Sequence, residues 1–273
     1  MAPSSPVLIG VVGDSGSGKT TLSSRIAQAV GIGRATLICL DDYHRYDRAE
    51  RDRRAITALN PDCNRLGLVA EHLTALRRGD SITKPVYDHH DGTFGPDEVV
   101  APREVIVVRG LLGLHTEALT RCFDLSVFLD PDPALRVAWK VERDCEKRGY
   151  SRAQVMAQIE QRRPDADRYV APQRERADIA IRFTPALRRG TGGEGYPLDM
   201  RITLRRLEGH DSAGSPGHRA DSSTPGVART PAGQRVVPVV LSAAASVREA
   251  GAATPPGSPA ASDSSPSSPA GSP

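Results

Sequence analysis

An apolar run followed by a glycine-rich turn constrains the fold of this chain more than any other feature. Val7–Val12 is short and apolar enough for a buried parallel strand. Gly13–Thr20 reads Gly-Asp-Ser-Gly-Ser-Gly-Lys-Thr and fits the phosphate-loop pattern G-x-x-x-x-G-K-S/T at every fixed position. Apolar residues with helical spacing follow over Thr21–Val30. A strand, this loop and a helix in that order predict a nucleotide-binding α/β domain.

Each residue type in the loop suits a phosphate ligand. Glycines let backbone N–H groups point at phosphate oxygens where side chains would clash, and the helix adds its positive dipole end. Lys19 is expected to reach the β- and γ-phosphates, and the Thr20 hydroxyl to bind Mg²⁺. Only four lysines stand among 36 Lys and Arg residues, so a lysine here indicates a need for a compact ammonium. We therefore predict an ATP site made by Gly13, Asp14, Ser15, Gly16, Ser17, Gly18, Lys19, Thr20 and Thr21.

Further strands and helices alternate along the chain and predict an α/β fold, a mainly parallel sheet with helices on both faces. Strands are expected at Thr36–Leu40, Val105–Val108, Leu125–Leu129 and Ile179–Phe183, with an edge strand at Met200–Leu207. Helices are expected at Leu66–Arg78, ended by Gly79, at Ala134–Arg148, ended by Gly149, and from a Ser151 cap to Arg163. A hairpin is expected within Ser81–Val100, around Asp91-Gly92.

Composition divides the chain into a folded domain, residues 1–208, and a C-terminal tail, residues 209–273. The tail is rich in Ser, Ala, Pro and Gly and holds none of the aromatic residues. Such a segment cannot bury enough apolar surface to offset its ordering entropy, which predicts disorder. Within it, the apolar stretch Val236–Leu241 is a candidate for a transient strand or a docking peptide, although a chance cluster is favoured.

Charge and cysteine usage exclude several classes of protein. The net charge of +3 is too even to favour nucleic acid or an anionic membrane surface as a partner. No apolar run approaches the ~18 residues that a membrane span needs. Four cysteines without a C-x-x-C pair are typical of a reducing compartment, so a cytoplasmic location is expected. A homo-oligomer is compatible with the sequence.

The acceptor of the phosphoryl group is expected beside the end of the second strand, where Asp41 and Asp42 follow. A kinase needs a base for the hydroxyl proton, and either carboxylate is placed for that role. Arg48, Tyr87 and His89 together could hold a small phosphorylated polyol, with the guanidinium on phosphate and the other two groups on sugar hydroxyls.

Four charged residues of the helix from Ala134 share one face because their spacing is i, i+3, i+4 and i+8: Lys140, Arg143, Asp144 and Arg148. Such a stripe is usually only a solvated face. Three cations there would also suit a mobile lid that clamps ATP and neutralises the transferring phosphate.

In these segments the sequence resembles the phosphoribulokinase/uridine kinase family of P-loop kinases. The resemblance spans about residues 7–207 and rests on the phosphate loop, Cys39-Leu-Asp-Asp-Tyr-His44, Thr57-Ala-Leu-Asn-Pro61, Lys84-Pro-Val-Tyr-Asp-His89, Trp139-Lys-Val-Glu-Arg-Asp144 and Arg163-Pro-Asp165. It implies a P-loop kinase fold and ATP- and Mg²⁺-dependent phosphorylation of O1 of D-ribulose 5-phosphate, a Calvin-cycle step.

The resemblance also implies roles for individual residues. Asp41 matches the catalytic base, and Asp41 and Thr20 match the metal ligands. Further catalytic residues are matched by Lys19, Arg143 and Asp144. Arg148 matches an ATP contact. Contacts to the sugar phosphate are matched by His44, Arg48, Tyr87, His89 and Lys140.

Two positions depart from the family pattern. Plant-type members carry one redox cysteine in the loop and one before the base, whereas this chain has Ser17 and Cys39 there. The third strand ends in a metal-binding Glu in the family, and here it ends in Arg109. Arg109 could contact the γ-phosphate or form an ion pair with Asp41 or Asp42; we expect the ion pair, because the substitution removes a ligand as well as adding a cation.

Two other functions stay open. One is a kinase for another small acceptor such as uridine, which would need stacking groups and no arginine for a substrate phosphate. The other is a nucleotide-binding regulatory protein whose catalysis is impaired by Arg109; it would bind ATP without turnover.

Overall fold

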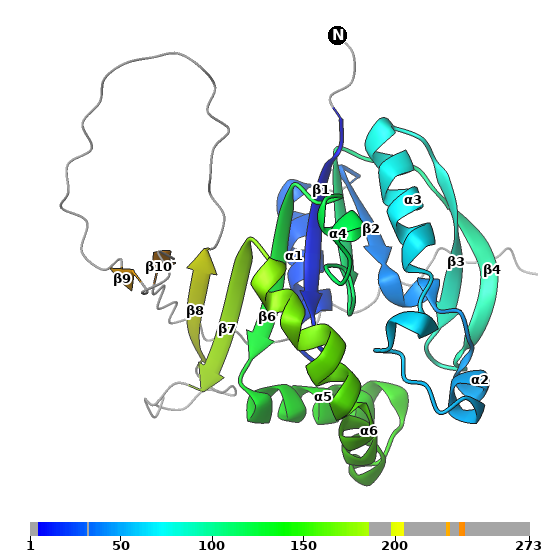
Figure 1. Cartoon of the computed structure of the whole chain (residues 1–273), viewed down its shortest axis with the longest axis vertical. Helices are drawn as coiled ribbons and strands as arrows, with labels where there is room; N and C mark the ends of the chain where they lie inside the picture. The colour runs from blue at the N-terminus through cyan, green and yellow to red at the C-terminus, as the bar shows by residue number, and fades with distance from the viewer. Residues whose placement is uncertain (1–4, 32, 186–197, 205–227, 230–234, 238–273) are drawn as a thin grey trace, which may run out of the picture.

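Five parallel strands form the centre of the sheet, in the order β2-β5-β1-β6-β7 (Figure 1). This computed structural model describes residues 5–31, 33–185, 198–204, 228–229 and 235–237. The strands of the main sheet are β1 (Val7–Gly13), β2 (Ala35–Cys39), β5 (Val105–Gly110), β6 (Leu125–Pro131), β7 (Ile179–Pro185), β8 (Leu198–Leu204), β9 (Ala228–Arg229) and β10 (Arg235–Val237). A separate antiparallel hairpin is made of β3 (Ile82–Asp88) and β4 (Thr93–Val100).

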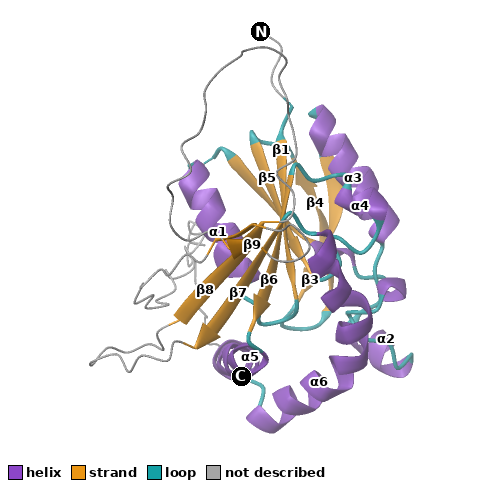
Figure 2. Ribbon diagram, turned by 60° about the vertical axis from the view of Figure 1, so that its left-hand side comes forward, coloured by secondary structure: helices purple, strands orange, loops and turns teal. Residues whose placement is uncertain are grey.

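Helices cover both faces of the sheet, as predicted (Figure 2). On one face, Leu22 and Ile26 of α1 (Lys19–Val30) pack against Val11 and Val107. On the other face, α3 (Leu66–Arg78) packs against the residues that alternate with these along the same strands, among them Leu8 and Ile106. Because successive side chains of a strand point to opposite faces, the near-continuous apolar runs in the sequence serve two helical layers at once.

The predicted helix ends are confirmed where a cap specifies them. Gly79 and Gly149 end α3 and α5 (Pro133–Arg148) in the left-handed conformation that glycine adopts without strain. Ser151 begins α6 (Arg152–Asp165) with a reciprocal capping box to Gln154. No helix in the described ranges is long and apolar enough to cross a membrane.

The expectation of an edge strand at Met200–Leu207 is wrong in one respect. Strand β8 runs antiparallel to β7, but β10 pairs with its other side, so β8 is internal. Strand β10 contains Val236, the start of the apolar stretch noted in the tail, and it carries the sheet past residue 208. Apart from β9 and β10, the predicted disordered tail lies outside the described residues.

Short helical elements escaped prediction because they lack a full apolar period. They are α2 (Arg48–Arg53), α4 (Glu117–Thr120), and the helical turns Leu40–Tyr43, Pro61–Cys63, Ala166–Val170 and Ala171–Arg176. Side-chain caps specify three of them: Asp47 accepts a hydrogen bond from Glu50 N, Asn60 accepts one from Asp62 N, and Thr116 accepts one from Leu119 N.

A close approach between two strand ends gives a stability prediction. A Cβ on Gly110, at the end of β5, would lie 2.5 Å from Cβ of Leu40, just after β2. We expect Gly110→Ala to lower the free energy of unfolding by about 1–3 kcal/mol through overpacking. Gly67→Ala, where a Cβ meets nothing within 4 Å, is the control and should not destabilise. Urea unfolding measures both; equal stability of the two variants would contradict the prediction.

Candidate active site

The phosphate loop connects β1 to α1 and is held open by glycine. Gly16 and Gly18 have φ angles of 84° and 92°, which other residues rarely adopt. A Cβ on Gly16 would also lie 2.8 Å from Cβ of Lys140, so only glycine lets α5 pack this closely on the loop. Lys19 Nζ donates to the carbonyl oxygen of Asp14 at 2.8 Å, which points the ammonium across the loop.

Helix α5 lies against the loop, where a lid over ATP was predicted. Arg136 forms an ion pair with Asp14 at 2.9 Å and donates to the Ser15 carbonyl oxygen at 3.2 Å. Arg143 Nη2 lies 3.4 Å from Ser15 Oγ. The sequence analysis missed Arg136, although it stands four residues before Lys140 on the same helical face.

The charged stripe of α5 converges on Asp144, which is fully buried. Lys140 donates a short hydrogen bond to it, and Arg143 and Arg148 pair with it at 2.8 and 3.5 Å. Burial raises the pKa of Asp144, but the Lys140 hydrogen bond and the neighbouring charges outweigh this and the pKa lies below its usual value. Lys140, which was predicted to contact the substrate, is only 2% exposed, and its ammonium binds Asp144 instead.

The two carboxylates after β2 have different surroundings. Asp42 is buried, accepts a hydrogen bond from Lys84 Nζ at 2.7 Å and another from Tyr87 N at 3.1 Å. Asp41 is partly exposed and lies 3.6 Å from Nε2 of His89. Asp42 therefore holds the hairpin, and Asp41 is the carboxylate left to face a ligand.

Charge around Asp41 keeps it ionised. Burial raises its pKa, but positive charge prevails and the pKa lies below its usual value. The charge comes from His44 and His89, which are protonated at the acidic pH where Asp41 titrates, and from Lys19 and Arg109. In return, burial lowers the pKa of Lys19 to about 8, against the opposing effect of Asp41 and Asp14. The loop ammonium and this carboxylate are thus electrostatically coupled.

Tyr87 is the centre of the predicted acceptor residues. Its ring makes edge contacts with His44 and His89, at centroid distances of 5.0 and 5.2 Å. Arg51 donates to its hydroxyl at 2.6 Å and lies over its ring. His44 in turn is held by Asn64 at 2.9 Å. Burial lowers the pKa of both histidines, which favours neutral rings.

Arg48 has a local role that the sequence analysis did not anticipate. Its guanidinium donates to the carbonyl oxygens of His89 and His90, at 2.6 and 3.3 Å, at the turn of the hairpin. It therefore orders the segment that carries His89.

Two further arginines of the site were missed because nothing in their local sequence marks them. Arg51 is buried on α2, and Arg162 lies on α6, whose end is tied to the segment after α2 by a 2.5 Å hydrogen bond from Thr57 to Asp165. Burial, followed by the charge of Arg51, lowers the pKa of Arg162. Neither arginine forms an ion pair with any described carboxylate, although the charges of Asp144, Asp41 and Asp14 oppose the lowering of the pKa of Arg162.

Arg109 does not form the ion pair that was expected. It lies in the sheet beside Cys39 of β2 and Val11 of β1, and among the described residues its guanidinium has no hydrogen bond or ion pair. Asp42 is engaged by Lys84, and the nearest partner of Asp41 is His89. Burial raises the pKa of the Cys39 thiol to about 11, which makes it unreactive near neutral pH.

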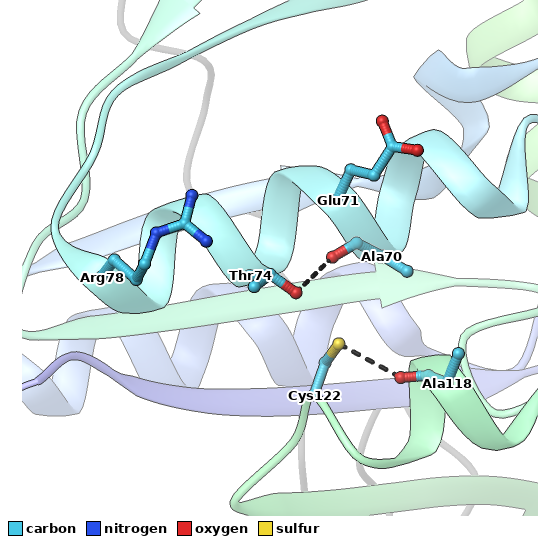
Figure 3. Close-up of a pocket in the computed structure, with 6 residues that line it drawn as sticks. All are labelled: Ala70, Glu71, Thr74, Arg78, Ala118 and Cys122. Carbon is cyan, nitrogen blue, oxygen red and sulfur yellow. Dashed lines mark hydrogen bonds between the residues drawn. The ribbon is translucent and has the colours of Figure 1, made fainter.

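A hollow lies between α3 and α4, away from the phosphate loop (Figure 3). Thr74 Oγ1 donates to the Ala70 carbonyl oxygen at 2.7 Å, and Cys122 Sγ to that of Ala118 at 3.3 Å. Both polar groups are thus bound within their own segments. None of the site residues predicted from the sequence lines this hollow.

Comparison with known proteins gives one family. The family described as "Phosphoribulokinase / Uridine kinase family" matches residues 8–188. A phosphoribulokinase of Synechocystis sp. is 41% identical over 179 residues, which cover 66% of this chain and 54% of that protein. The chloroplastic phosphoribulokinase of Arabidopsis thaliana is 34% identical, covering 73% and 55%. The chain spans about half the length of these curated relatives.

A uridine kinase of Ligilactobacillus salivarius is 32% identical over 207 residues, which cover 74% of this chain and 93% of that protein. Among solved structures, phosphoribulokinase from Rhodobacter spheroides superposes with a TM-score of 0.60 at 22% identity, covering 86% of this chain and 91% of that one. This likeness confirms the P-loop kinase fold.

The lowered pKa of Lys19 predicts a pH dependence of nucleotide binding. The ammonium is charged below pH 8 and neutral above it, so affinity for ADP should fall as pH rises from 7.5 to 9.5, by at most ~10-fold per unit. Lys19→Arg keeps its charge over this range and should show a flatter profile. Calorimetric titration at each pH measures this; parallel profiles for the two proteins would contradict the assignment.

Proposed function

Because the chain belongs to the phosphoribulokinase/uridine kinase family, we propose that it transfers the γ-phosphoryl group of ATP to a hydroxyl of D-ribulose 5-phosphate, giving ribulose 1,5-bisphosphate. The names of the relatives at 34–41% identity support this acceptor. The loop, α1 and α5 form the ATP side, and the end of β2 with the β3–β4 hairpin forms the acceptor side.

The proposal of a phosphorylated acceptor rests on arginines of the acceptor side that have no carboxylate partner among the described residues. Arg48 donates to the backbone of His89, Arg51 donates to the hydroxyl of Tyr87, and the charge of Arg51 acts on Arg162. Among the described residues no carboxylate forms an ion pair with any of these three arginines. A buried or half-buried cation without a counter-ion is costly, and a bound dianion would balance it. An acceptor that carries its own phosphate supplies that charge, whereas a nucleoside does not.

Asp41 is the proposed base. The acceptor oxygen forms a bond to the γ-phosphorus while the bond from that phosphorus to the bridging oxygen of ADP breaks, and the hydroxyl proton passes to a carboxylate oxygen of Asp41. His89, 3.6 Å from this carboxylate, and Tyr87 beside it are placed to orient the hydroxyl groups of the sugar.

The residues present also fit Mg²⁺. The described residues contain no group of three or more His, Cys, Asp or Glu that could hold a metal. The Thr20 hydroxyl and the Asp41 carboxylate are oxygen donors of the kind that Mg²⁺ prefers and are the proposed protein ligands. A magnesium ion commonly takes its remaining ligands from nucleotide phosphates and water. When bound, it would neutralise charge on the phosphates.

A uridine kinase is the second candidate, because this chain covers 93% of the Ligilactobacillus enzyme but only about half of the phosphoribulokinases. An acceptor screen separates the candidates. In an ADP-release assay we expect turnover with ribulose 5-phosphate to exceed that with uridine or unphosphorylated ribulose by at least ~100-fold, since charge-assisted contacts to the phosphate would be lost. A preference for uridine would reject the proposal, and ATP binding without turnover of any acceptor would favour a regulatory protein.

The different surroundings of the two adjacent carboxylates predict different effects of their removal. Asp41→Asn should lower kcat by roughly 10²–10⁴-fold, the usual contribution of a general base, with an unchanged melting temperature. Asp42→Asn, which loses the charge that pairs with Lys84, should lower the melting temperature and reduce kcat less. Steady-state kinetics and thermal unfolding compare the two. The assignment is wrong if Asp42→Asn loses more activity while remaining fully stable.

A further inference from the structure

Arg109 occupies a place in the sheet that faces the nucleotide. It pairs in register with Val11 of β1, two residues before the phosphate loop, and with Cys39 of β2, two residues before Asp41. Arg109 and Val107 are two residues apart in β5, so their side chains point to the same face of the sheet. Val107 packs toward α1 on that face. Because α1 begins at Lys19 at this same edge, the guanidinium lies on the face where the loop and the first turn of α1 meet.

The backbone around Arg109 is tightly placed. Gly110 packs so closely on Leu40 that a Cβ there would lie 2.5 Å from Cβ of that residue. Leu40 directly precedes Asp41, so the same contact sets the spacing between the strand end that carries Arg109 and the one that carries the proposed base. A residue on such a rigid element can contribute to a reaction without first being ordered.

Arg109 makes no direct contact with a described carboxylate, although its charge helps to lower the pKa of Asp41. The side chain is half-buried, yet no hydrogen bond or ion pair links it to a described residue. By contrast, two arginines of α5 are paired with carboxylates: Arg136 with Asp14 and Arg143 with Asp144. A guanidinium cannot lose its proton in a protein, so an unpaired one at a phosphate-binding edge calls for an anionic ligand.

We propose that Arg109 is a catalytic residue that donates hydrogen bonds to the γ-phosphoryl oxygens of bound ATP. As the bond to the bridging oxygen breaks and the bond to the acceptor oxygen forms, these oxygens stay close to Arg109, which stabilises their charge. The strand thus supplies in cis a cation that does not depend on closure of α5. The inference rests on the proposed phosphoryl transfer but not on which hydroxyl compound accepts the group.

Nucleotide binding alone tests the contact, with no acceptor present. We expect Arg109→Ala to weaken binding of the ATP analogue adenosine 5′-(β,γ-imido)triphosphate by ~10-fold or more and to change ADP binding less than twofold, because ADP lacks the γ-phosphate. Arg25→Ala, an exposed arginine on α1, should alter neither. Equal weakening of both nucleotides by Arg109→Ala, or no weakening of either, overturns the proposal.

Turnover gives an independent readout. Arg109→Ala should lower kcat by about 10²–10³-fold, as for loss of one transition-state donor, and added guanidinium ion at non-denaturing concentration should restore part of it. Arg109→Lys should keep intermediate activity, and melting temperatures show whether each variant is folded. A higher kcat for Arg109→Glu than for the wild type overturns the proposal. If no acceptor is phosphorylated, slow ATP hydrolysis replaces kcat, and the binding comparison still decides.

Discussion

The ion pair between Asp42 and Lys84 holds the acceptor half of this site together. Its charged atoms lie 2.7 Å apart, and the lysine side chain is 5% exposed. Asp42 also accepts a hydrogen bond from the backbone of Tyr87, so one carboxylate fixes the hairpin β3–β4 to the end of β2 at two points. Loss of one partner of such a pair costs about 3–5 kcal/mol, because a buried charge is left alone. The hairpin has its own two-stranded sheet, so this contact brings Tyr87 and His89 to Asp41.

The charges of the site follow one pattern on the two sides of the phosphate loop. On the nucleotide side the carboxylates pair with cations: Asp14 with Arg136, and Asp144 with Lys140, Arg143 and Arg148. These pairs are satisfied within the protein and order α5 against the loop. At the ends of β2 and β5 the pattern differs: Arg48, Arg51 and Arg109 form no ion pair with a carboxylate in the part of the chain that the structure describes. The cations that stabilise the fold therefore differ from those that could bind a ligand mainly in whether a carboxylate of the protein pairs with them.

Local signals account for the parts of the fold that were predicted well. The phosphate loop, the apolar strands and the capped helices α3, α5 and α6 are specified by residues within a few positions of one another. Elements of one turn, such as α4, carry too little periodicity to be recognised. The position of β8 inside the sheet depends on β10, which pairs with it from more than 30 residues away.

The sequence by itself therefore determined the nucleotide half of the protein: a P-loop α/β fold, the loop ligands, and a carboxylate pair at the end of the second strand. Tertiary structure decided which member of that pair is free, because Lys84 and Tyr87 reach Asp42 across more than 40 residues. It also decided that Lys140 is buried against Asp144, that Arg51 supports Tyr87, and that Arg109 forms no ion pair with any described carboxylate. The sequence shows which charged residues are present. The net charge around a bound ligand depends on ion pairs between residues far apart in the sequence, and only the folded chain establishes these.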